Sequence, residues 1–544
     1  MTARVTVCLC VLVSFVAGGQ GFRAVCFGEE LPQPEVAELL PADTLAYARI
    51  VDVDDVLHEC ITSSAFSDEA VLKLFQGLED EIAGGLEKIG FSRDGLGELY
   101  KTATSLHLAI VGINYEEEYP CLLGVLELTD PAIAGRILAD YVRRAAEEGL
   151  GPDEDKLTWD FRGHTVYRVE IDSDFPTHIA LKGRRLFFAS DPFDLKTMLL
   201  GKKPDMALAQ VPAYRQLSKR YESRKCFVFG NAQGGFRLLR QGLDTDELDE
   251  LNTADNVLGL RDIMAVGIGS SIGIKPNETA VEMTILLDES NPMRSMSRGA
   301  PLDPTQHLNV LPKGCFFGLF GNFTDPAATW QRVGKLFGEF DGAGELRRFR
   351  ERSIREGIDI DELGKMASGP IGLFMVPPDD DPDDASGALA ISIRDHNSLK
   401  TSLQKAIDAD PRQGMEEIGK FEGRPVDGGD FESFMIGPGY AFLGLDMGGG
   451  PIEATRKGIA AAEDEANRDT ALIRTIASIG EGTATRVLFF APSAFPGDHT
   501  MRRLAPAEGV DFPWVLTCHE EKDALRFRSN VSVFTIIMAM ILVD

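Results

Sequence analysis

One strand motif near the start of the chain returns near its middle, and the elements that follow it return in the same order. The motif is Leu40-Pro41-Ala42-Asp43-Thr44-Leu45-Ala46-Tyr47, and its altered second form runs from Leu311-Pro312 into Phe316-Phe317-Gly318-Leu319-Phe320. The apolar spacing after each form predicts helices, a hairpin, a helix, a strand meander and a closing helix. The separation between matched positions shrinks smoothly along the chain, which chance resemblance would not produce. The sequence therefore predicts a tandem duplication.

Each copy is expected to be an α+β unit. Short turns join most of the predicted strands, and strands joined in this way pair antiparallel. Because every sheet and helix must bury an apolar face, we expect mostly antiparallel sheets packed by helices. The predicted divisions are a signal peptide at residues 1–21, a linker at 22–38, a first repeat half at 39–300 and a second at 301–544.

The charge balance disfavours nucleic acid as a partner. The chain holds 55 Lys and Arg residues against 85 Asp and Glu residues, a formal net charge of −30. Such a surface repels phosphate backbones unless a local basic patch overrides it. The densest basic run, residues 347–355, also contains Glu351 and is interpreted as a solvated helix face.

The amino terminus has the layout of an export signal. Arg4 supplies a positive start, residues 5–17 form an apolar run too short to span a bilayer, and Ala17-Gly18-Gly19 offers a cleavage site. We therefore expect an extracytoplasmic protein, periplasmic or secreted. Beyond this segment the cysteines have no paired spacing, which predicts mostly buried thiols, with one disulfide kept as an alternative: Cys26, Cys60, Cys121, Cys226, Cys315 and Cys518.

The last stretch of the chain, residues 531–543, is nearly all apolar. A helix of this length would cover about 20 Å, short of the roughly 30 Å core of a bilayer. A buried strand followed by a packed helix is therefore favoured. Membrane attachment through this stretch is the alternative.

Ser271 is the one serine with a catalytic motif around it. Gly269-Ser270-Ser271-Ile272-Gly273 matches the G-x-S-x-G nucleophile elbow and follows a strand-like run. An elbow needs a helix directly after the serine, whereas Lys275-Pro276-Asn277 indicates a turn before another strand. A β-hairpin is therefore favoured, with catalysis at Ser271 as the alternative.

No cofactor is predicted, and a metal is predicted only as an alternative. Clustered carboxylates suit Ca²⁺, and one predicted hairpin tip carries Asp379, Asp380, Asp381, Asp383 and Asp384. The alternating ligand order of a calcium loop is missing, which favours a solvated acidic loop. Met447-Gly448-Gly449-Gly450-Pro451 lacks the ending of a phosphate-binding loop and is interpreted as a flexible connection to a helix.

The motif at Leu40-Pro41-Ala42-Asp43-Thr44-Leu45-Ala46-Tyr47 resembles the opening of large, uncharacterised secreted proteins of planctomycete-type bacteria. In these proteins a signal peptide precedes such a strand, and repeated α+β units follow. The resemblance implies an extracytoplasmic bacterial protein with no established activity. It carries over no functional residues.

These observations favour a non-catalytic protein of the cell envelope that acts as a binding or structural module for an unknown protein or small-molecule partner. One alternative is a secreted hydrolase whose triad is dispersed in the sequence. Another is a carrier for a lipid or peptide, suggested by the phenylalanine-rich strand that begins at Phe316. Core packing is the commoner reason for such a strand.

Overall fold

The computed structural model describes residues 34–56, 93–114, 119–148, 157–172, 175–271, 278–296, 299–329, 331, 347, 351, 360–377, 385–409, 416–425, 431–445, 451–491 and 513–531. The predicted signal peptide, both acidic hairpin tips and residues 532–544 lie outside these ranges. Helix and strand contribute 38% and 39% of the structure, and the strands form antiparallel sheet, so the chain is an α+β protein as predicted. Two compact units divide it: unit 1 holds residues 1–242 and 264–273, and unit 2 holds residues 243–263 and 274–544.

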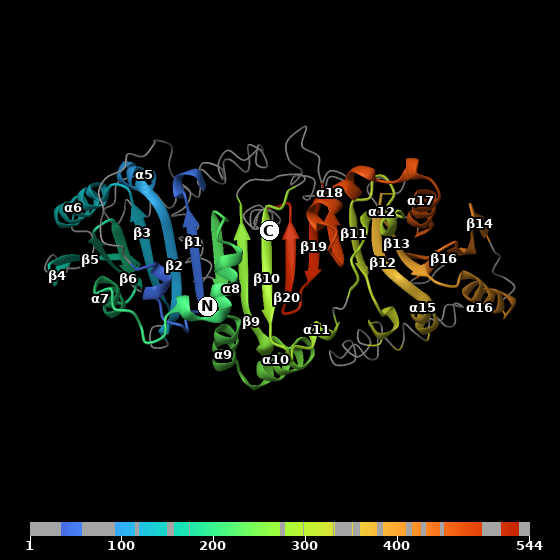
Figure 1. Cartoon of the computed structure of the whole chain (residues 1–544), viewed down its shortest axis with the longest axis horizontal. Helices are drawn as coiled ribbons and strands as arrows, with labels where there is room; N and C mark the ends of the chain where they lie inside the picture. The colour runs from blue at the N-terminus through green and yellow to red at the C-terminus, as the bar shows by residue number, and fades with distance from the viewer. Residues whose placement is uncertain are drawn as a thin grey trace. The chain divides into compact units, whose positions relative to one another are not determined.

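The strands of unit 1 pair in the order β9, β8, β1, β2, β3, β7, β6, β5, β4, all antiparallel. Figure 1 shows them from blue to green. Their bounds are β1 (Ala46–Val51), β2 (Ala103–Asn114), β3 (Tyr119–Leu128), β4 (Thr158–Phe161), β5 (His164–Asp172), β6 (Phe175–Lys182), β7 (Arg185–Ala189), β8 (Cys226–Gly230) and β9 (Ile263–Ser270).

Helices cover parts of both faces of this sheet. On one face, α5 and α6 bury Leu99, Tyr141 and their neighbours against Leu106 and Leu126. On the other face, α8 brings Tyr214 to 5.6 Å from the ring of Tyr47. The helices of the unit are α2 (Val36–Leu39), α5 (Arg93–Thr102), α6 (Pro131–Glu148), α7 (Pro192–Leu199), η3 (Leu208–Gln210), α8 (Pro212–Arg220) and α9 (Ala232–Gly242).

Local sequence sets several of these boundaries. Pro192 starts α7, and the Asp191 carboxylate accepts the Phe193 amide, which satisfies a donor that the first turn leaves open. Between β4 and β5, Arg162 and Gly163 both take positive φ, at 53° and 83°. Two such residues make the tight turn whose twist suits a hairpin, as the sequence predicts here.

The strands of unit 2 pair in the order β10, β20, β19, β18, β11, β12, β13, β17, β16, β15, β14, again antiparallel. Their bounds are β10 (Val281–Leu287), β11 (Phe317–Asn322), β12 (Ala367–Val376), β13 (Ser386–Ile393), β14 (Glu416–Ile418), β15 (Phe421–Pro425), β16 (Phe431–Gly437), β17 (Tyr440–Leu445), β18 (Arg486–Phe490), β19 (Trp514–Glu520) and β20 (Ala524–Ser529).

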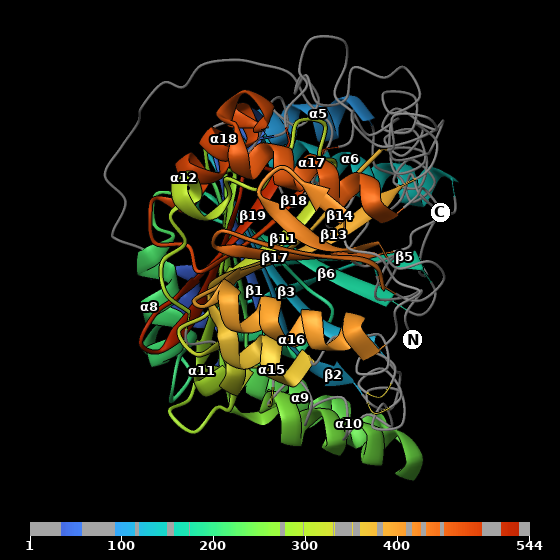
Figure 2. The ribbon, with the colours of Figure 1, turned by 90° about the vertical axis from the view of Figure 1, so that its right-hand side faces the viewer.

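The two faces of this second sheet are covered unequally. One face packs against α17 and α18, and its core includes Phe320, Phe374 and Phe489. The other face packs against α15 and α16 along β12, β13, β16 and β17. Figure 2 shows these two helix pairs on opposite sides of the strands. The helices are α10 (Thr245–Leu258), η4 (Leu260–Asp262), α11 (Met293–Met296), α12 (Pro304–His307), α15 (Ile360–Met366), α16 (His396–Ala409), α17 (Pro451–Glu463), η5 (Glu465–Asn467) and α18 (Thr470–Gly480).

Gly372 shows how closely the core of unit 2 is packed. A Cβ built on this residue would lie 2.0 Å from Cδ1 of Phe320, which is its direct partner across β11 and β12. The position therefore has no room for a side chain, and the Phe320 ring takes that space. Among the described residues, no helix combines the length and apolarity that crossing a membrane requires.

Candidate functional site

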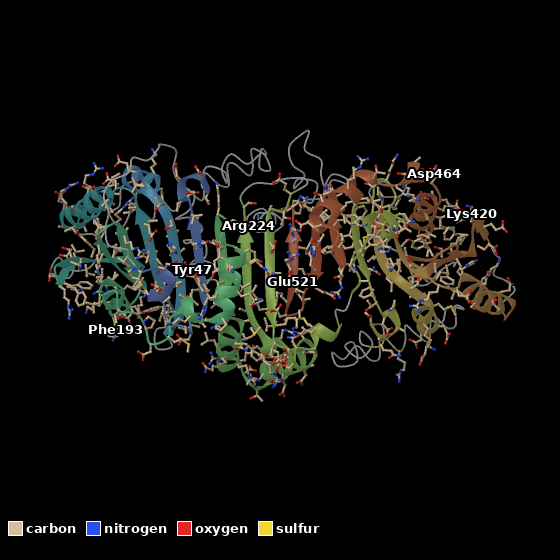
Figure 3. The ribbon with its side chains drawn as sticks, viewed as in Figure 1. Tyr47, Phe193, Arg224, Lys420, Asp464 and Glu521 are labelled. Carbon is tan, nitrogen blue, oxygen red and sulfur yellow. The ribbon has the colours of Figure 1, made fainter. Side chains whose placement is uncertain are left out.

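The most connected polar group of unit 1 lies on the sheet face that carries α8. It consists of Tyr47 on β1, Ser105 and His107 on β2, Glu127 on β3 and Arg185 on β7, and Figure 3 labels Tyr47. Ser105, Glu127 and Arg185 are direct partners across neighbouring strands. Tyr47 is 2% exposed, so the group begins in the interior. We call these five residues the polar chain.

Hydrogen bonds run through the polar chain in one direction. The Ser105 hydroxyl donates to Oε2 of Glu127 at 2.9 Å, so its oxygen is left to accept from Nε2 of His107 at 3.0 Å. With its proton on Nε2, His107 accepts from the Tyr47 hydroxyl at Nδ1, at 2.7 Å. Arg185 closes the chain by donating from Nε to Oε1 of Glu127 at 2.9 Å. His107 is therefore a neutral histidine of defined tautomer.

The electrostatics agree with these assignments. Burial lowers the pKa of His107 to about 4, against the pull of Glu127 in the other direction. Burial alone would raise the pKa of Glu127, but hydrogen bonds from Ser105 and Arg185 hold that pKa below its usual range. Arg185 also donates from Nη1 to the carbonyl of Pro34 at 2.7 Å. The carboxylate and the guanidinium are thus a paired, hydrogen-bonded ion pair.

The polar chain contains serine, histidine and glutamate, but its geometry opposes nucleophilic catalysis. In a catalytic triad the histidine takes the proton of the serine hydroxyl, and the acid holds the other ring nitrogen. Here the serine gives its proton to the carboxylate and accepts one from the histidine. Ser105 is also buried. The arrangement ties four strands together rather than activating a hydroxyl.

Unit 2 has its own buried polar cluster, on β10, β19 and β20. Arg528 lies opposite Glu282 across the strands and reaches the Glu481 carboxylate at 2.5 Å. Arg526 pairs with Glu521, which Figure 3 labels, at 3.2 Å. Three carboxylates therefore surround two guanidinium groups. This balance leaves no net positive charge to attract an anionic ligand.

His519 lies beside this cluster and is also held neutral. Its Nδ1 lies 3.0 Å from the Thr483 hydroxyl, and its Nε2 lies 3.0 Å from the Thr517 hydroxyl. Burial lowers the pKa of His519 to about 4, and Arg526 and Arg528 lower it further. Cys518 faces the opposite side of the same strand, so the two neighbours do not form a thiolate–imidazole pair.

The most exposed apolar surface of unit 2 is a row of leucines. Leu319 on β11, Leu488 on β18 and Leu516 on β19 are direct cross-strand partners and therefore share one face of the sheet. Leu319 is 48% exposed and Leu516 is 36% exposed, while Leu488 is half-buried. We call these three residues the leucine row.

Aromatic side chains extend this surface along the same strands. Phe317, Phe490 and Trp514 are again direct cross-strand partners, two residues from the leucine row, and all three are half-buried. The Phe490 and Trp514 ring centroids lie 6.0 Å apart in an edge-to-face arrangement. Phe320 points to the opposite, buried face, so core packing accounts for the inward phenylalanines of β11.

Ser271 lies directly after β9 and is half-buried. The helix that a nucleophile elbow requires would fall at residues 272–277, outside the described residues, so catalysis at Ser271 stays a prediction. The first glycine of the motif has a packing role. A Cβ on Gly269 would lie 2.2 Å from Cδ1 of Tyr221, so only glycine lets the end of α8 approach β9.

The predicted calcium positions, Asp379, Asp380, Asp381, Asp383 and Asp384, and the glycine run at Gly448-Gly449-Gly450 lie outside the described residues. Within the part of the chain that is described, no group of three or more His, Cys, Asp and Glu side chains is arranged to hold a metal ion. The structure thus leaves the acidic tip as a sequence prediction.

Sequence reasoning missed both the polar chain and the leucine row. A signal for the row was present, since β11, β18 and β19 alternate buried and outward residues about Leu319, Leu488 and Leu516. No comparable signal marked the polar chain. Its members come from four strands, and only pairing shows that they meet.

No protein-family model matches the chain, and no curated protein sequence matches it. Among solved structures, crystal form I of TP0453 aligns with 79% of this chain and 98% of its own, at 8% identity and a TM-score of 0.19. A likeness this low supports no conclusion about fold or function.

Proposed function

We propose that the protein is a non-catalytic, extracytoplasmic binding module of the bacterial envelope, built from two copies of one α+β unit, and that the leucine row is its binding surface. The observation that carries the proposal is the exposure of Leu319 and Leu516 on a continuous apolar strand face. Soluble proteins rarely leave adjoining large apolar side chains in water, and such patches mark interaction sites.

The strand pairings support the duplication. β1 pairs with β2 and β8, and β11 pairs with β12 and β18. The repeated motif is seated alike in both places. The Leu208 amide donates to the Leu40 carbonyl at 2.8 Å, and the Asp469 amide donates to the Leu311 carbonyl at 3.1 Å. The motif is therefore assigned an architectural role, anchoring the first strand to the segment before a helix.

The polar chain supports a non-catalytic assignment. If the two halves are matched by strand register, the positions of Tyr47 and His107 correspond to Gly318 and Gly372. The second half thus fills with the Phe320 ring what the first half fills with hydrogen-bonded polar groups. Two packings of the same space indicate a stabilising role for the polar chain.

The binding proposal is tested with the full chain and the apolar dye 8-anilinonaphthalene-1-sulfonate. The wild-type protein is expected to enhance the dye's fluorescence, and Leu319→Glu with Leu516→Glu should lower that enhancement by roughly half or more, because a carboxylate disfavours an apolar contact. The matched control is Phe193→Glu, which places the same charge at a 72% exposed position of unit 1. Equal fluorescence in all variants, with intact circular dichroism, contradicts the proposal.

The non-catalytic assignment has its own test. A panel of ester and peptide substrates is incubated with the wild-type chain and with Ser271→Ala. No turnover is expected from either. Hydrolysis by the wild type that Ser271→Ala abolishes would establish the hydrolase alternative instead.

A further inference from the structure

We infer that the partner of the leucine row is an amphipathic α-helix with a basic polar face, contributed by another protein. This inference rests on the proposed function, since it names what the surface binds. It is drawn from the backbone pairing under the row, from the way the same sheet face is covered nearby, and from the charge of the chain.

The backbone under the leucine row excludes an added strand. β11 pairs with β12 and β18, β18 pairs with β11 and β19, and β19 pairs with β18 and β20. All three strands are therefore interior to the sheet, and their ladder groups face other strands. An extended peptide lying on this face would find no sheet edge to pair with and would bury its own backbone polar groups unpaired, at a cost of several kcal/mol by a rough count. A helix satisfies its own backbone and avoids that cost.

The same sheet face is covered by helices where the row continues. Leu319 pairs with Leu373, which pairs with Leu389, so the leucines run on across β12 and β13. There Leu389 packs into the core formed with Leu363 of α15 and Leu399 of α16. The exposed leucine row is thus continuous with a helix-packed surface of the same composition.

The dimensions suit one helix. Strands lie about 4.8 Å apart, so the three strands of the row span about 10 Å, close to the diameter of an α-helix with its side chains. Such a helix meets Leu319, Leu488 and Leu516 through a stripe of apolar residues at every third or fourth position.

Charge favours a basic polar face on that helix. The chain carries a formal charge of −30, so its field attracts cationic partners. Arg486, on the strand of Leu488, is neutralised by Glu520, whose Oε1 lies 3.0 Å from Nη2 of the arginine. This local pair therefore does not oppose the attraction between the protein and the lysines of a partner helix.

The inference is tested with a synthetic peptide of about 18 residues that places leucine on one helical face and lysine on the other. Fluorescence anisotropy of the labelled peptide is measured against the full chain, with a scrambled peptide of equal composition as the control. We expect saturable binding of the patterned peptide, a gain of helical circular dichroism, and roughly tenfold weaker binding to Leu319→Glu and to Leu516→Glu. Phe193→Glu should bind as the wild type does.

The outcomes separate this inference from the function it rests on. If the dye binds through the leucine row but the scrambled peptide binds as well as the patterned one, or palmitate binds and neither peptide does, the helix partner is wrong and the binding surface stands. Concentration-dependent dimers in sedimentation velocity that Leu319→Glu abolishes would assign the surface to a second copy of the chain and overturn the helix partner. If neither dye nor peptide responds to Leu319→Glu, both proposals fall.

Discussion

Lowering the pH should destabilise unit 1 through His107. Its folded pKa is about 4, held down chiefly by burial, whereas an unfolded histidine titrates near 6.5. Between these values the unfolded chain binds a proton that the native state does not, so stability falls as the pH falls through this window. From about pH 7.5 to about pH 4.5 the two pKa values give a loss of about 2.5 kcal/mol from this one residue.

The assay is urea unfolding followed by pulsed hydrogen–deuterium exchange mass spectrometry of peptides from β2, which reports on the strand that carries His107. The comparison is His107→Gln, which cannot take up a proton. The groups facing position 107 in the variant are still Tyr47, Arg49, Glu127 and Arg185, so their own pH dependence largely cancels.

The His107→Gln variant should be less stable at neutral pH, because hydrogen bonds are lost, but less sensitive to acid by about 2.5 kcal/mol. Parallel losses of stability in the two proteins would refute the reasoning, since the proton taken up on unfolding would then not be that of His107. His519 is also held neutral, but in unit 2, and the β2 peptides do not report on it directly.

Two further predictions concern packing. Gly372→Ala should lower the free energy of unfolding by about 1–3 kcal/mol in urea titrations, because the new methyl group would meet the Phe320 ring, whereas Gly112→Ala, with nothing within 4 Å of its Cβ, should have little effect; equal effects would contradict this account of the core. Burial raises the pKa of the Cys315 thiol, so iodoacetamide should modify Cys315 only in urea while the half-buried Cys121 reacts under native conditions, as read by peptide mass spectrometry; native labelling of both at one rate would count against the burial of Cys315.

The amino-acid sequence by itself was enough to predict the elements and their type. Period-two alternation marked the strands, Asp191-Pro192 marked the start of α7, and Arg162-Gly163 marked a hairpin turn. These signals are local, since each depends on the backbone preferences of a few adjacent residues. The excess of acidic residues is likewise a property of the composition alone, and it disfavours nucleic acid as a partner whatever the fold.

Only the tertiary structure decided which side chains meet. Tyr47 and His107 are 60 residues apart, yet strand pairing brings the hydroxyl to 2.7 Å from the ring nitrogen. The leucine row likewise needs the registers of β11, β18 and β19, and a shift of one residue would turn each leucine to the buried face. Register depends on burying one whole sheet face against helices from distant segments, so no short stretch of sequence contains it. For the same reason Leu319 and Phe320, neighbours in the chain, lie on opposite sides of the sheet, one exposed to solvent and one in the core.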